Sequence, residues 1–125
     1  MGFRCPVCSQ PGALEIQARI QLPADARSDE IALQLVRCAA CGFAGPAVYE
    51  ESRRGALDSE AWDHYGWRVP AADLADFEQA LRACPAPEDE DCSCAAHHRY
   101  AGRDAAGRWL GAALFHVLED YDLRR

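Results

Sequence analysis

The chain has 125 residues, of which 50% are hydrophobic and 26% are charged, and its formal net charge is −7. Lysine is absent and arginine supplies all 13 basic side chains, which excludes Schiff-base chemistry and a P-loop lysine. The acidic balance disfavours non-specific coating of nucleic acid, because that binding depends on neutralising phosphates. No apolar run reaches the roughly 18 residues of a membrane span, and no secretory signal is recognisable, so we expect a soluble cytoplasmic protein without a membrane partner.

Two Cys-x-x-Cys pairs frame the first part of the chain, at Cys5/Cys8 and at Cys38/Cys41. After the first pair, apolar side chains alternate over 14–22, as on a strand with one buried face. Residues 23–29 are rich in Pro, Asp and Ser and predict a loop. The alternation resumes from residue 31 up to the second pair. The sequence therefore predicts a hairpin that brings the two cysteine pairs together at one end.

Four thiolates on two tight turns can supply the tetrahedral ligand set of a zinc ion. Seven cysteines without a secretory signal also favour metal over disulfides. The alternatives for Cys5, Cys8, Cys38 and Cys41 are a redox pair or free thiols. Because four protein ligands leave no open position for water or substrate, we expect this zinc to be structural.

The motifs Cys5-Pro6-Val7-Cys8 and Cys38-Ala39-Ala40-Cys41-Gly42-Phe43 resemble those of the zinc ribbon family. The resemblance covers roughly residues 3–50 and implies a third strand, for which 47–49 is suited. It does not imply one function, since zinc ribbons occur in transcription and translation factors, enzyme subunits and small proteins. The first motif departs from the family pattern, because Ser9-Gln10 follows it where a glycine is usual.

The second part of the chain has a helical pattern and carries the whole net charge. We place a boundary near residue 55, with a zinc ribbon over 1–54 and a helical region over 55–125, packed as one unit. Asp58 or Ser59 caps a predicted short helix that carries Trp62 and Tyr65 and ends near residue 66. Further helices are predicted over 70–84 and 104–121, the latter from an apolar stripe at helical spacing.

A second group of metal-ligand residues lies between the last two predicted helices, at Cys84, Cys92, Cys94 and His97, with His98 as the alternative imidazole. Three thiols and one imidazole suit a second zinc site. Alternatively, Cys84 is a core thiol and the other two are free, or Cys92 and Cys94 form a redox dithiol. A catalytic zinc with an acidic base from 88–91 is the remaining possibility. His64 and His116 are spare ligand candidates, but each is more typical of a packed or surface residue.

Together these patterns predict an α+β protein, in which a zinc-ribbon hairpin or three-stranded sheet precedes a small helical region. One zinc is expected and a second is possible. We expect a non-enzymatic protein-interaction module that acts through a protein partner or self-association. A nucleic-acid-binding ribbon is the first alternative, and a metal- or thiol-dependent enzyme built on the Cys84, Cys92, Cys94 and His97 group is the second.

Overall fold

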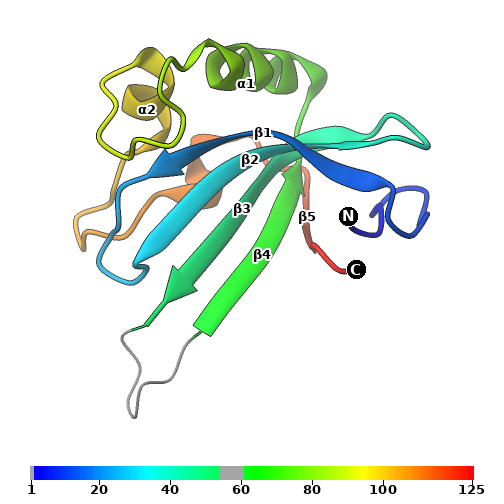
Figure 1. The fold of residues 1–125 in the computed structure, drawn as a ribbon, viewed down its shortest axis with the longest axis horizontal. Coiled ribbons are helices and arrows are strands. Elements are labelled where there is room, and N and C mark those ends of the chain that lie inside the picture. Colours follow the sequence, from blue (N-terminus) through cyan, green and yellow to red (C-terminus); the bar gives the residue numbers. More distant parts are fainter. Residues whose placement is uncertain (1, 54–60) are drawn as a thin grey trace.

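Five antiparallel strands form one sheet in the computed structural model, which describes residues 2–53 and 61–125. Each strand pairs with the next in sequence, so the order across the sheet is β1-β2-β3-β4-β5 (Figure 1). Two α-helices complete an α+β fold, as predicted. The strands are β1 (Leu14–Leu22), β2 (Glu30–Cys38), β3 (Ala44–Ser52), β4 (Ala61–Arg68) and β5 (Glu119–Asp122).

The hairpin of β1 and β2 lies where the alternating apolar pattern predicted it. Its register pairs Leu14 with Cys38 at one end and Leu22 with Ile31 at the other. A bulge between Ile16 and Ala18 adds one residue to β1. The strand expected near 47–49 exists and is longer, since β3 pairs with β2 along nearly its whole length.

The helices α1 (Ala71–Ala83) and α2 (Ala95–Tyr100) lie over one face of the sheet (Figure 1). The predicted helix over 70–84 is confirmed, and Phe77 and Leu81 form its buried side. α2 was not predicted, because six residues are too few to show a helical period. The buried core between the sheet and the helices consists of Ile20, Leu22, Ile31, Leu33, Leu35, Val48, Trp67, Phe77, Leu81, Ala96, Tyr100 and Trp109.

The predicted helix at the start of the second part is wrong for the residues that the structure describes. Residues 61–68 form β4, which pairs with β3 from Ala47↔Gly66 to Ser52↔Ala61; positions 58–60 lie outside the described residues. Aromatic side chains lie on both faces of β4, so the alternation of apolar and polar residues that marks a strand is not visible in the sequence. Aromatic residues are nevertheless common in strands. Gly66 does not end a helix: a Cβ there would lie 2.7 Å from the Tyr121 ring, so glycine admits that ring.

The predicted helix over 104–121 is also wrong. Within that range, all of which the structure describes, a 3₁₀ turn at Gly111–Leu114 is the only helical part, and Glu119–Asp122 form β5 on the edge of β4. Two glycines interrupt the stripe, since Gly107 and Gly111 have φ of 81° and 56°, a left-handed conformation that glycine adopts without strain. The apolar residues of the stripe do not share one buried face, since Leu110 and Leu118 are exposed while Leu114 and Val117 are half-buried.

The opposite face of the sheet is covered only at one end by the segments that the structure describes. There the N-terminal segment joins β1 through the Phe3↔Leu14 bridge, and the Arg4 N–H donates to the carbonyl of Arg124 at 2.6 Å. A second, smaller core forms beneath these segments from Phe3, Cys5, Ala13, Leu14, Val36, Cys38, Ala47 and Leu123. In the part of the chain that the structure describes, neither helix combines the length and the apolar character that crossing a membrane requires.

Candidate metal centres

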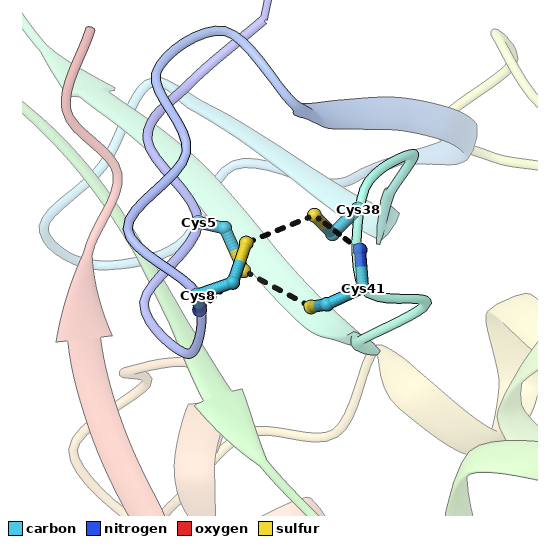
Figure 2. Close-up of side chains that lie close together, drawn as sticks. All are labelled: Cys5, Cys8, Cys38 and Cys41. Atoms are coloured by element: carbon cyan, nitrogen blue, oxygen red, sulfur yellow. Dashed lines mark hydrogen bonds between the residues drawn. The ribbon is translucent and has the colours of Figure 1, made fainter.

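The first cysteine group is formed by two turns that face each other at the end of the β1–β2 hairpin (Figure 2). The Cys5 and Cys41 sulfurs are 3.7 Å apart, as are those of Cys8 and Cys38. All four sulfurs lie within 4.8 Å of one another. The structure thus brings together the four residues that the sequence singled out, and each turn contributes one buried and one exposed cysteine.

Backbone amides point at the buried sulfur of each turn. The N–H groups of Ala40 and Cys41 donate to Cys38 Sγ at 3.3 and 3.4 Å. The Cys41 N–H is the main cause that lowers the pKa of Cys38 to about 7, because it stabilises the thiolate. In the first turn, Val7 and Cys8 donate to Cys5 Sγ in the same way. Both turns are therefore suited to thiolate ligands.

After the first Cys-x-x-Cys motif, Ser9 takes the position and the backbone conformation that a glycine has after the second motif. Gly42 follows the second turn with a φ of 81°, and Ser9 takes a φ of 65° at the matching place after the first. A residue with a Cβ in this left-handed region costs about 1 kcal/mol. The two turns therefore have the same course although their sequences differ.

The second group joins the end of α1, the following loop and the start of α2. Cys84 Sγ lies 3.9 Å from Cys92 Sγ and 3.5 Å from His97 Nδ1. Cys94 Sγ lies 3.2 Å from the same nitrogen. The chain bends at Cys94 to enter α2, so that Cys94 and His97, three residues apart, face the same point. His98 is exposed and is not part of the group.

His97 is held by a second hydrogen bond on the far side of its ring. Its Nε2 lies 2.8 Å from the carbonyl oxygen of Gln21 in β1, and the side chain is buried. A carbonyl can only accept, so Nε2 carries the proton and Nδ1 keeps its lone pair toward the sulfurs. Burial opposes ionisation of Cys94, but hydrogen bonds, led by the one from the His97 backbone N–H at 3.4 Å, outweigh it and lower the pKa of that thiol to about 6.

In each group, the spacing of the donor atoms suits a single tetrahedrally coordinated ion. With metal–sulfur and metal–nitrogen bonds of about 2.3 and 2.05 Å, tetrahedral angles separate two sulfurs by about 3.8 Å and a sulfur from a nitrogen by about 3.6 Å. The closest contacts are 3.7 to 3.9 Å between sulfurs and 3.2 to 3.5 Å between a sulfur and the nitrogen, and all donor atoms of a group lie within 4.8 Å of one another. A disulfide would need about 2.05 Å. Among the described residues, these two groups could hold metal ions.

The remaining candidates from the sequence lie outside both groups. His64 packs edge-on against Phe3 and lies 2.7 Å from the Gln34 side chain. His116 is exposed, and its backbone N–H donates to Asp73 at 3.3 Å. The acidic residues 88–91 form an exposed stretch of the loop before Cys92.

A buried ionic network was missed by the sequence interpretation. Arg108 donates to the carboxylate of Asp25 and, at 2.6 Å, to that of Glu50. The Tyr65 hydroxyl and Ser28 Oγ donate to Glu50 as well, at 2.5 and 3.1 Å. Burial alone would raise the pKa of Asp25, but three backbone N–H groups and Arg108 hold it well below its usual range. The charges are more than 20 residues apart in sequence, so no local signal pairs them.

Comparison with protein-family models, with curated proteins and with solved structures finds no match.

Proposed function

We propose that the chain binds two zinc ions as structural centres and acts as a non-enzymatic binding module with a zinc-ribbon-like hairpin. The observation that carries this proposal is the donor spacing of the two groups, which suits tetrahedral zinc. Thiolate-rich sets with one imidazole or none favour zinc over the hard ions that prefer oxygen ligands.

The saturation of both sites supports a structural role. Cys5, Cys8, Cys38 and Cys41 make a complete set of four thiolate ligands, and the second group makes a complete set of three thiolates and one imidazole. A catalytic zinc keeps one position for water or substrate, and neither set leaves one. The proposal therefore assigns no catalytic step to either ion.

Each ion would join segments that have little apolar surface of their own. The first would fix residues 3–13 to the end of the β1–β2 hairpin, over the smaller core. The second would fix the loop after α1 to β1, where the Gln21 N–H also donates to the carbonyl oxygen of Pro87 at 2.7 Å. Structural zinc contributes on the order of 10 kcal/mol in small domains, enough to order such segments.

The open part of the sheet supports the assignment as a binding module. Trp62 is 62% exposed there and Ile16 is 41% exposed, on the face that the helices leave uncovered. Exposed aromatic surface next to a rigid sheet is typical of contact sites. We assign the binding surface to this face.

Cobalt substitution tests the zinc proposal. Protein refolded with Co²⁺ should bind two ions and show the strong visible absorption of tetrahedral cobalt thiolate centres. Cys38→Ser keeps only the second site intact and Cys94→Ser keeps only the first. The thiolate band of Cys38→Ser should therefore be weaker than that of Cys94→Ser. The first variant leaves three thiolates and the second leaves four. Octahedral spectra, or one ion per chain, would contradict it.

A further inference from the structure

A groove of about 680 Å³ runs along the open face of the sheet. Its apolar lining is mostly aromatic, with Trp62 and Tyr49 stacked at 6.4 Å between ring centroids and an interplanar angle of 24°. Phe3 and Leu123 lie on the part of the lining that belongs to the smaller core. The size and the aromatic lining are those of a site for a small molecule.

Gln34 and His64, on two strands of the sheet, supply uncharged polar groups to the groove. Gln34 is only 5% exposed, and its Oε1 lies 2.7 Å from His64 Nε2. Burial, together with the charge of Arg125, lowers the pKa of His64 to about 4, so its ring is neutral at neutral pH. A neutral imidazole that donates from Nε2 keeps Nδ1 as an acceptor. The Gln34–His64 pair is uncharged, so it offers hydrogen-bonding groups to a ligand and repels neither anions nor cations.

The charged side chains among the described residues that line the groove are all basic. Arg124 and Arg125 line it, and none of these lining side chains is Asp or Glu, although the chain has 20 of them. The Arg125 guanidinium lies 5.1 Å from the centroid of the Phe3 ring. Arg124 also contacts Asp122 at 3.2 Å, and both of these side chains are largely exposed. The groove is thus a basic, aromatic site on an acidic protein.

We propose that this groove binds a small planar aromatic molecule that carries a phosphate or carboxylate group. The ring stacks on Trp62 and Tyr49, and the anionic group pairs with Arg125, since guanidinium matches both anions. This inference rests on the open face being the binding surface, as proposed above. The net charge of −7 decides against a nucleic-acid strand, because a polyanion would meet repulsion outside the groove. It also disfavours a second copy, which would bring a further seven negative charges.

The test uses zinc-loaded protein and two probes, adenosine 5′-monophosphate and indole-3-acetate, with binding followed by NMR shifts of the Trp indole N–H signals. Both probes should saturate and shift the Trp62 signal. Adenosine lacks the anionic group and inorganic phosphate lacks the aromatic ring. Each should bind about tenfold more weakly than adenosine 5′-monophosphate, because one charge-assisted contact or one stacked ring is lost.

Two variants and two controls locate the site. Trp62→Ala lacks the reporter indole and is therefore titrated by calorimetry, in which it should show no saturable binding, and Arg125→Ala should bind about tenfold more weakly. Leu118→Ala and Arg27→Ala change exposed residues outside the groove and should bind as the parent does. Both groove residues are surface side chains, so a two-zinc mass and an unchanged spectrum show that a variant is folded.

The inference is overturned by the absence of saturable binding of either probe, or by Arg125→Ala binding as tightly as the parent. It is also overturned if a ten-nucleotide single strand binds more than about tenfold tighter than the mononucleotide. Concentration-dependent dimerisation that Trp62→Ala abolishes would also overturn it, by making a second copy the occupant. Each of these can occur with both zinc ions bound, whereas failure to bind zinc would contradict the proposed function itself.

Discussion

The Nε2 atom of His97 lies 2.8 Å from the carbonyl oxygen of Gln21, so a residue of the helical layer is fixed to the edge strand of the sheet. The opposite nitrogen of the same ring faces Cys84 and Cys94. A metal-ligating histidine is usually oriented by such an outer hydrogen bond, which fixes the tautomer. The second site therefore connects α1, α2 and β1 through one side chain.

Replacing a ligand of this site should loosen the helical layer first. We expect Cys94→Ser to lose one zinc and to raise hydrogen exchange in 84–100, while the amides of β2 and β3 stay protected, because these inner strands are paired with a neighbouring strand on both sides. Ser93→Ala, at the neighbouring exposed position, is the matched control. Unchanged exchange in 84–100 would show that the site does not order this layer.

Loss of a ligand from the first site should destabilise the sheet more than loss of one from the second site. Cys38 is both a proposed ligand and the last residue of β2, so Cys38→Ser should release the Cys5–Cys8 turn and unfold the end of the hairpin. The expected loss of stability is at least about 3 kcal/mol, since one ligand of a structural zinc is removed. Thermal unfolding measures it, with Ala40→Ser as the control. Cooperative unfolding at the parent temperature would contradict a structural role.

The buried ionic network gives a prediction that is independent of metal. Arg108→Met leaves the carboxylates of Asp25 and Glu50 buried without their cation, which should cost about 3 kcal/mol. Arg27→Met removes an exposed pair 3.6 Å from Asp63 and should cost less than about 1 kcal/mol. Denaturant unfolding compares the two, and equal losses would show that the network has no special weight. Both variants should keep their zinc.

His64 predicts a specific pH dependence. Its pKa in the folded protein is about 4, below the usual 6.5, because burial and Arg125 disfavour the imidazolium. The unfolded chain therefore takes up a proton first as the pH falls, so this contribution to stability is complete above pH 6.5 and is lost toward pH 4.

Measured relative to His64→Gln, the parent should lose roughly 1–2 kcal/mol of unfolding free energy between about pH 7 and pH 5, after allowance for partial solvation of the ring. The comparison cancels the acid lability of the metal ligands, which both proteins share. A difference that does not change with pH would contradict the neutral, buried imidazole.

The sequence predicted best where its signals were local. The alternation over 14–22 and the spacing of Cys5, Cys8, Cys38 and Cys41 located the hairpin and the first cysteine group. The choice of His97 rather than His98 also agrees with the group that the structure brings together. Cysteine spacing is informative because a metal-binding turn is itself a local structure.

The errors came from residues whose structure depends on distant partners. The apolar stripe of 104–121 has a helical period. However, its last residues pair as β5 with the edge of β4, and Gly107 and Gly111 adopt positive φ values that an α-helix does not contain. Trp62 and Tyr65 suggested a helix because both faces of β4 carry aromatic side chains. The Arg108 network joins four segments that only the tertiary fold brings together.

Native mass spectrometry of protein purified without added metal shows directly whether the chain holds two zinc ions. Two zinc ions are expected in the parent, one in Cys38→Ser, one in Cys94→Ser and none in the double variant. A single zinc in the parent, or a parent mass that shows disulfides in place of metal, would contradict this expectation.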